Sequence, residues 1–386
     1  MEVRAVTVNG RTYRWPARPV VVVCLDGSAF EYIDRAIAAG VAPYLRSLAG
    51  LQFFRLVESA LPSFTNPNNV SIVTGVPPSV HGISGNVFLD RDSGETVVMN
   101  DASYLQAETI LATFSRAGAR VAVVTAKDTV RRLLAHGVSG TCVSIEGTGV
   151  EVYSAALSEQ ALAEGARLMA SGPPDLMYLS TSDYVQHKHA PGDAEANRFY
   201  GAIDRSLAEI DRLGATLVIT ADHGMRAKAD ASGKVRAVFL QDVLDGWLGA
   251  GAARVVLPIT DPYVLHHGAL GACAMVYLSA PEQAAALAAR IQALAGIDVA
   301  VARDEACRRF DLPSARTGDI AVFSDGETVI GTRPAEHDLS ALDAPLRSHG
   351  GRAEQEVPMF ANRAVAGGSR PRHNYDAFDV ALNGCA

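Results

Sequence analysis

Carboxylate and imidazole side chains stand in this sequence where buried strands are expected to end. Asp26 directly follows the apolar run VVVVCL, and the adjacent pair Asp222 and His223 follows another such run in LVITADHGM. Functional groups of open parallel sheets gather just beyond the carboxyl ends of the strands. Because the chain turns there, the Asp222 carboxylate and the His223 imidazole can converge on one cation. Taken singly, each of these acids also fits a turn or helix-capping role.

A second group of ligands is indicated by spacing. Asp183 and His187 are four residues apart in STSDYVQHKHAPG, so a helix places both on one face, where they can chelate one ion. The same helix would turn His189 away, and we interpret it as a bystander or as a residue that supports a ligand without binding the metal. His349 precedes two glycines in RSHGGRAEQEVP, which lets the backbone bend closely around a ligand, although a plain loop histidine is the alternative. The remaining histidines lack such context and are interpreted as structural: His81, His136, His266, His267, His337 and His373.

The donor set predicts the kind of metal and the kind of reaction. It contains carboxylates and imidazoles without paired thiolates, which suits catalytic zinc, and manganese or iron less well. Five or six ligands are too many for one tetrahedral ion and suit two ions that share a site. Two-metal sites of this kind commonly stabilise the attacking and leaving atoms of a displacement at phosphorus. We therefore expect chemistry of the phosphoryl-transfer type.

A nucleophile is suggested by LPSFTNPNNVSIVTG. We expect Pro67 to mark a helix start and Thr65 to lie just before the helix N-terminus, where the helix dipole favours anions. A metal ion there would lower the pKa of the Thr65 hydroxyl. A helix-capping threonine is the alternative. The sequence has no GxxxxGK[ST], no GxGxxG after a strand and no GxSxG, so it gives no support to a P-loop, a dinucleotide site or a hydrolase elbow.

These residues need an α/β framework to bring them together. Continuous apolar runs predict strands, and amphipathic stretches between them predict helices, in an order typical of a largely parallel sheet flanked by helices. The expected strands are 20–25, 53–58, 120–125, 175–180 and 216–220, and the expected helices are 42–48, 105–117, 129–135, 154–170 and 194–212.

The pattern changes after about residue 227. The strand-like CAMVYL, a helix over 281–295 and short strands at 298–302 and 319–323 predict a smaller inserted α+β cap. We expect a catalytic core formed by residues 1–226 and 345–386, with the cap over 227–344.

Composition limits the function classes. The 386 residues are 48% hydrophobic and carry a net charge of −8, which fits a globular protein and disfavours a nucleic-acid partner. There is no apolar run of about 18 residues and no signal-peptide pattern at the start, so we expect neither a membrane span nor secretion. Five cysteines without CxxC spacing indicate reduced thiols and a cytoplasmic protein. A homo-oligomer is one option that the sequence leaves open.

The ordered motifs resemble those of the alkaline phosphatase superfamily, and within it those of the phosphonoacetate hydrolases, over roughly residues 19–363. The similarity rests on CLDGS, PSFTNPNN, HGISGN, TAKD, STSDYVQHKHAPG, TADHGM and SHGGRAEQEVP. It implies an alkaline phosphatase-like fold and a di-zinc hydrolase. Such an enzyme cleaves the carbon–phosphorus bond of phosphonoacetate, a small anionic substrate, through a phosphothreonine intermediate.

The resemblance also implies roles for single residues. It implies one zinc held by Asp26, Thr65, Asp222 and His223, and another held by Asp183, His187 and His349. It further implies that Thr65 attacks phosphorus, that Asn86 hydrogen-bonds the phosphonyl oxygens, and that Lys127 belongs to the substrate pocket, which Asp183, His187 and His349 also border.

One position departs from the family pattern and bears on the substrate. Relatives often carry a second lysine where this chain has Thr129, and our hypothesis is that Arg131 or Arg132 substitutes for it. The main alternative function is a nucleotide pyrophosphatase/phosphodiesterase with the same ligands and a different pocket. A phosphoglycerate mutase-like enzyme and a non-catalytic metal-stabilised binding protein fit less well, because the former commonly uses serine with manganese and structural zinc sites are rich in cysteine.

Overall fold

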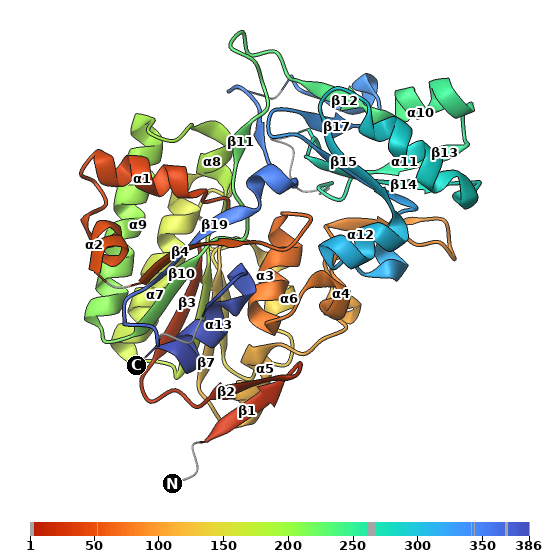
Figure 1. Cartoon of the computed structure of the whole chain (residues 1–386). Coiled ribbons are helices and arrows are strands. Elements are labelled where there is room, and N and C mark those ends of the chain that lie inside the picture. The colour runs from red at the N-terminus through yellow and green to blue at the C-terminus, as the bar shows by residue number, and fades with distance from the viewer. Residues whose placement is uncertain are drawn as a thin grey trace.

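The structure is a computed structural model, which describes residues 4–51, 53–260, 268–340, 342, 344–366 and 370–385, without the side chain of residue 51. A seven-stranded sheet forms its centre (Figure 1). In spatial order the strands are β4 (Phe53–Glu58), β19 (Glu356–Ala361), β10 (Thr216–Thr220), β3 (Val20–Cys24), β9 (Leu176–Ser180), β7 (Val121–Thr125) and β8 (Thr141–Ser144). The five strands from β10 to β8 pair in parallel, whereas β19 runs antiparallel to both of its neighbours. The predicted largely parallel α/β sheet is confirmed.

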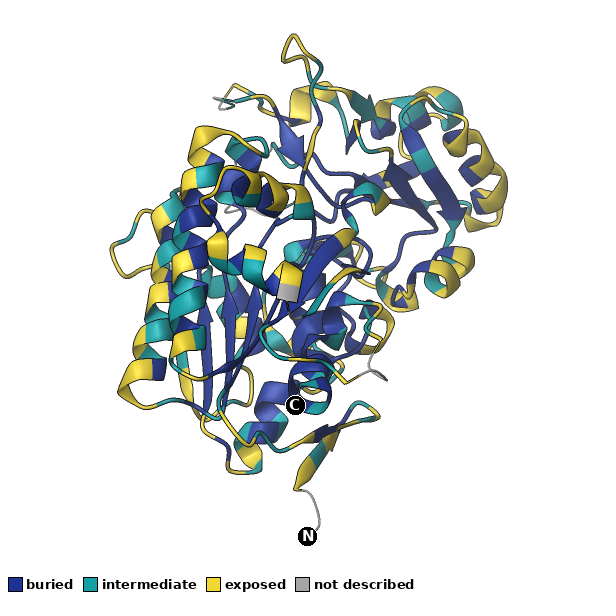
Figure 2. Cartoon of the chain, turned by 60° about the vertical axis from the view of Figure 1, so that its left-hand side comes forward, coloured by how far each residue is buried: buried dark blue, intermediate teal, exposed yellow. Residues whose placement is uncertain are grey.

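Helices cover both faces of this sheet, and the central strand shows why. All five residues of β3 are buried, and its side chains alternate between two separate hydrophobic clusters, with Val20 and Val22 in one and Val21 and Val23 in the other. One face carries α1 (Phe30–Ala38), α2 (Pro43–Leu51), α7 (Ala155–Ser171) and α9 (Ala194–Arg212); the other carries α3 (Thr65–Thr74), α5 (Ile110–Arg116), α6 (Asp128–Leu134) and α13 (Ala377–Asp379). Figure 2 shows the buried strands behind helices whose outer sides are exposed.

A smaller α+β unit packs beyond the core and has its own hydrophobic cluster. Its sheet is antiparallel, in the order β13 (Ala253–Val256), β14 (Cys273–Leu278), β16 (Ile320–Ser324) and β15 (Ile297–Ala302). The unit also contains α10 (Leu240–Leu248), α11 (Ala284–Gln292), α12 (Arg303–Phe310) and the parallel pair β12 (Ala237–Phe239) and β17 (Val329–Gly331). This arrangement agrees with an inserted cap, whose boundaries at 227 and 344 stay a prediction.

Short strands join the two units. The chain leaves the core through β11 (Arg226–Ala227) and returns through β18 (Arg347–Ser348), and these two strands pair antiparallel. The core also sends a hairpin toward the cap, formed by β5 (Val87–Leu89) and β6 (Thr96–Val98), in which Val87 and Leu89 belong to the cap cluster. It follows α4 (Pro78–His81).

The predicted elements agree with the structure apart from a few ends and omissions. The helix expected over 105–117 begins only at Ile110, because the Thr109 hydroxyl accepts a hydrogen bond from the Ala112 amide and caps the helix there. The helix expected over 281–295 divides into a 3-10 turn at Pro281–Gln283 followed by α11, which ends at Gln292. The N-terminal hairpin of β1 (Ala5–Val8) and β2 (Arg11–Arg14) and the helix α1 were not predicted. None of the helices in the described residues has the length and apolar character needed to cross a membrane.

Candidate metal centre and active site

The polar residues predicted from the sequence do stand at one edge of the core sheet. Asp26 lies two residues beyond β3, Asp222 two beyond β10, Asp183 three beyond β9, and Lys127 two beyond β7. These four strands are neighbours and parallel, so their carboxyl ends meet.

One cluster forms around Asp26 and His223. The Nε2 atom of His223 lies 3.2 Å from the Asp26 carboxylate and 3.8 Å from that of Asp222. The Thr65 hydroxyl oxygen lies 3.5 Å from Asp26 and 3.3 Å from His223 Nε2. Ligand atoms of Asp26, Asp222 and His223 all lie within 4.8 Å of one another, close enough for one ion.

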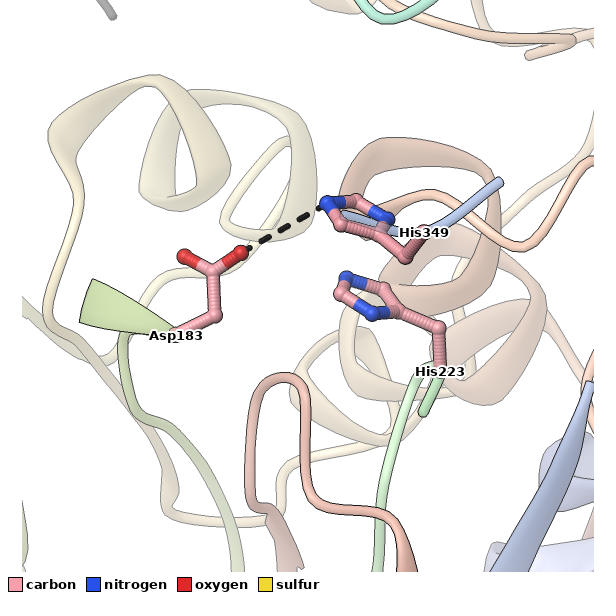
Figure 3. Close-up of side chains that lie close together, drawn as sticks. All are labelled: Asp183, His223 and His349. Atoms are coloured by element: carbon pink, nitrogen blue, oxygen red, sulfur yellow. Dashed lines mark ion pairs between the residues drawn. The ribbon is translucent and has the colours of Figure 1, made fainter. Parts of the chain in front are cut away.

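A second cluster forms around Asp183. His187 Nε2 lies 3.0 Å from the Asp183 carboxylate and His349 Nε2 lies 3.7 Å from it, as Figure 3 shows for His349. The rings of His223 and His349 stack almost parallel, with centroids 3.6 Å apart. Asp183, His223 and His349 therefore form a second potential metal-binding group. His223 belongs to both groups, so the two clusters are contiguous.

The three histidines are oriented in the same way. Each Nδ1 atom faces a backbone carbonyl: that of Arg347 for His187 at 2.8 Å, that of Gly224 for His223 at 2.9 Å, and that of Ser63 for His349 at 2.9 Å. A carbonyl accepts a hydrogen bond, so each Nδ1 carries a proton, and Nε2 is the nitrogen that can bind a metal when the ring is neutral. Metal-bound histidines are fixed by this kind of hydrogen bond.

The electrostatics of the site favour cations. Burial and the neighbouring Asp26 charge raise the pKa of Asp222 to about 8, because two carboxylates share a space without solvent. The pKa of His223 is raised to about 9, since Asp222 and Asp26 outweigh the opposing effect of burial. Burial and the charges of His223 and His187 hold the pKa of His349 well below its ordinary value.

Lys127 is the one ammonium group placed between the clusters in the described part of the chain. Its Nζ lies 2.9 Å from Asp183 and 3.2 Å from Asp26. Although burial opposes it, these carboxylates raise the pKa of Lys127, and Lys127 together with His187 holds the pKa of Asp183 well below its usual range. The carboxylate and imidazole donors, the Nε2 atoms directed at the carboxylates and the several buried acids together fit two divalent cations.

Thr65 is the first residue of α3 rather than the residue before the helix. Phe64 has the extended conformation of a helix N-cap, so the helix begins two residues before Pro67 and the expected start is corrected. The N-terminal amides of α3, a helix of ten residues, are thus next to the Thr65 hydroxyl, which is half-buried and faces Asp26 and His223.

Asn69 was not predicted from the sequence, and it joins the helix α3 to Asp222. Its Nδ2 donates to the Thr65 carbonyl and to the Asp222 carboxylate, both at 3.0 Å. Its Oδ1 accepts from Tyr178 at 2.8 Å and from Ser180 at 2.9 Å. The run of asparagines among apolar residues was the signal that could have indicated Asn69, because buried amides need several hydrogen-bond partners.

Lys127 and Asn86, the predicted substrate residues that are not also predicted metal ligands, differ in their positions. Lys127 lies between the clusters, as described above, whereas the Asn86 amide donates to the Ile259 carbonyl of the cap at 3.1 Å. Arg131 and Arg132, the hypothetical substitutes for a second lysine, both pair with Asp128 at 2.8 Å.

Neither His187 nor the remaining histidines belong to the two metal-binding groups of the described residues, although His187 contacts Asp183. His81 is buried and bonds to Ser71 and Ile83, and burial lowers its pKa to about 3. His337 bonds to the Gly268 carbonyl within the cap. His189 ends the helix α8 (Tyr184–Lys188). His266 and His267 lie outside the described residues.

Comparison with known proteins identifies the family. Residues 20–352 match the model of the family described as type I phosphodiesterase / nucleotide pyrophosphatase. The chain belongs to this family. It is an enzyme family of the alkaline phosphatase superfamily, so the superfamily membership and the fold predicted from the motifs are confirmed.

Within the family, the similarity to phosphonoacetate hydrolases extends over the whole chain. Crystal structures of phosphonoacetate hydrolase from Sinorhizobium meliloti 1021, in complex with phosphonoformate and with phosphonoacetate, are 50% identical, superpose with a TM-score of 0.94 and cover 100% of both chains. The predicted resemblance to these hydrolases is therefore confirmed. Murine ectonucleotide pyrophosphatase/phosphodiesterase 5 shares the fold at 18% identity, with a TM-score of 0.68 over 94% of this chain and 93% of that one.

A curated relative matches nearly the whole chain less closely. An ectonucleotide pyrophosphatase/phosphodiesterase of Caenorhabditis elegans is 26% identical over 370 residues, which cover 89% of this chain and 45% of the worm protein. The chain spans less than half the length of the curated relatives that it matches.

Proposed function

We propose that this chain hydrolyses the carbon–phosphorus bond of phosphonoacetate, giving acetate and phosphate. The observation that carries the proposal is the Asp and His cluster around Thr65. It lies in a chain 50% identical over its full length to a phosphonoacetate hydrolase that binds phosphonoacetate. We propose two zinc ions, one held by Asp26, Thr65, Asp222 and His223 and the other by Asp183, His187 and His349.

Bound zinc would lower the pKa of a hydroxyl or water and neutralise the phosphonyl oxygens, which is the chemistry that carboxylate and imidazole sites supply. Thr65 would act as the nucleophile. The hydroxyl gives up its proton to solvent, Oγ1 forms a bond to phosphorus while the phosphorus–carbon bond breaks, and the electron pair of that bond moves onto the acetate unit. A proton from solvent then gives acetate, and phosphothreonine is left at position 65.

The leaving group is a carbanion, so charge on its carboxylate must be stabilised. The Lys127 ammonium is suited to this because it is held at the mouth of the site with part of its side chain exposed. Its attraction to the substrate carboxylate grows as the enolate-like dianion forms, which favours the transition state over the ground state.

The second half of the reaction returns Thr65 to its starting state. A water molecule forms a bond to phosphorus, the bond from phosphorus to Thr65 Oγ1 breaks, and a proton returns to the hydroxyl. Asn86 would donate to a phosphonyl oxygen with one amide hydrogen while the other stays on the Ile259 carbonyl.

The second candidate is a nucleotide pyrophosphatase/phosphodiesterase, supported by the family match over residues 20–352. A substrate panel on zinc-loaded protein decides between the two. We expect phosphate release from phosphonoacetate far above that from phosphonopyruvate or a phosphomonoester. It should also far exceed the release of the phenol from an aryl phosphodiester and of nucleoside monophosphate from a nucleotide. Good turnover of the diester or the nucleotide, with none of phosphonoacetate, would transfer the assignment to the second candidate.

A further inference from the structure

Arg347 carries a positive charge into the interior directly behind the metal ligands. It belongs to β18, two residues before His349, and only 8% of its surface is exposed. Buried arginines usually pair with a carboxylate. In the described part of the chain no carboxylate lies within 4 Å of this guanidinium; its polar partners are backbone carbonyls.

The contacts of Arg347 reach the segments that hold all three histidine ligands. Its Nε donates to the carbonyl of Gln186, the residue before His187, at 2.9 Å. Its Nη2 donates to the carbonyl of Met225, two residues after His223, at 3.4 Å. Its own carbonyl accepts the hydrogen bond from His187 Nδ1.

A tyrosine completes this arrangement from the opposite side. The guanidinium carbon lies 5.7 Å from the centre of the Tyr32 ring. The Tyr32 hydroxyl lies 3.0 Å from the same Gln186 carbonyl and 2.7 Å from the His189 carbonyl, so these two carbonyls share its single proton. A planar guanidinium can donate in two directions and rest against a ring at the same time, which a lysine ammonium does poorly.

We propose that Arg347 is a positioning residue for the metal centre. It fixes the short helix α8 and the loop after His223 relative to β18, so that His187, His223 and His349 keep their Nε2 atoms directed at one place. The inference rests on the proposed function in one respect, since it takes these histidines as metal ligands. It adds a residue that touches neither substrate nor metal.

The test is the metal affinity of Arg347→Lys and Arg347→Gln, measured on purified protein by competition with a chromogenic zinc chelator. Residues that orient metal ligands typically change metal affinity by about 10–100-fold when replaced. We expect a loss of this size for at least one of the two zinc ions. Tyr32→Phe removes the hydroxyl donor that the Gln186 and His189 carbonyls share, and it should change the affinity in the same direction by a smaller factor.

Arg352→Lys is the matched control. It lies five residues further along the chain, is 40% exposed and pairs with Asp298, so its zinc affinity should equal that of the wild type. The thermal midpoint of each metal-free variant is measured in parallel. A purely structural role would lower that midpoint while leaving the zinc affinity of the folded protein unchanged, and this outcome would overturn the proposal.

Chemical rescue gives an independent test. Arg347 lines a groove of about 720 Å³ whose other residues include Glu31, Asp34, Glu327 and Glu356, so a small cation can approach it from solvent. Guanidinium at non-denaturing concentration should restore zinc affinity to Arg347→Ala, and potassium should not. A wild-type protein that binds no zinc would remove the proposed metal site, whereas normal zinc binding by all Arg347 variants would overturn this inference alone.

Discussion

The ion pair between Lys228 and Glu354 offers a quantitative test of how the cap is joined to the active site. Both side chains are 0% exposed, and Lys228 Nζ lies 2.9 Å from a Glu354 carboxylate oxygen. The other carboxylate oxygen accepts from the Gly351 amide, and the Glu354 carbonyl accepts from the Gly224 amide. The pair therefore connects the start of the cap to the loops that follow His349 and His223.

Removing one partner leaves an unpaired charge in the interior. Such a change costs about 3–5 kcal/mol, because the desolvation of the remaining ion is no longer compensated. We expect this loss for Lys228→Met and for Glu354→Gln. The Lys228→Met/Glu354→Gln double variant buries no unpaired charge, so its loss should be smaller than the sum by about 2–3 kcal/mol.

Urea unfolding of the four proteins, followed by fluorescence and circular dichroism at pH 7, measures this coupling. The exposed pair Arg212 and Glu209 is the control, and Arg212→Met should cost at most about 1 kcal/mol. If the sum of the two single-variant losses equals the loss of the double variant to within about 0.5 kcal/mol, the side chains do not interact as described and the reasoning is refuted.

Three further predictions concern the nucleophile, the metal and a buried histidine. Thr65→Val should lower turnover of phosphonoacetate at least about 1,000-fold while zinc content stays within twofold. Thr65→Ser should keep measurable turnover. Equal activity of the wild type and both variants would exclude Thr65 as nucleophile. Chelator treatment should abolish turnover and lower the thermal midpoint, and added zinc should restore both; an unchanged midpoint would argue against a metal that binds the folded state. His81 stays neutral in the folded state because burial lowers its pKa to about 3, whereas the unfolded chain protonates it below pH 6.5. Stability of the wild type should therefore fall by about 2 kcal/mol more than that of His81→Asn between pH 7 and 5 in urea titrations, and parallel pH profiles would contradict this.

Strands and amphipathic helices were predictable because the pattern of apolar residues in a short stretch of sequence indicates which residues are buried. The strand Thr216–Thr220 and the helix Ala194–Arg212 have the predicted bounds, since one is a continuous apolar run and the other has a clear apolar face. The helix α3 has no such face. Every residue from Asn66 to Thr74 is buried, and the asparagines are not separated from the apolar residues at a helical spacing. Hydrophobic periodicity therefore could not define where the helix starts.

The convergence of the candidate ligands was predictable for a different reason. Polar residues directly after buried strands must come together in a parallel sheet, and Asp26, Asp183 and Asp222 do so. Residues that act through backbone carbonyls give no comparable signal. Arg347 donates to carbonyls 161 and 122 residues away in the chain, and these partners become visible only once the chain is folded.

This site places three buried carboxylic acids close together. Asp26, Asp183 and Asp222 would repel one another in a buried space, and the imidazoles of His187, His223 and His349 add no positive charge when they bind a metal in the neutral form. The core compensates in part with Lys127, and the protein fixes every imidazole from outside through a carbonyl. Those carbonyls belong to residues 347, 224 and 63. The geometry of the candidate metal centre therefore depends on how the strand β18, the loop after β10 and the segment before α3 are packed together.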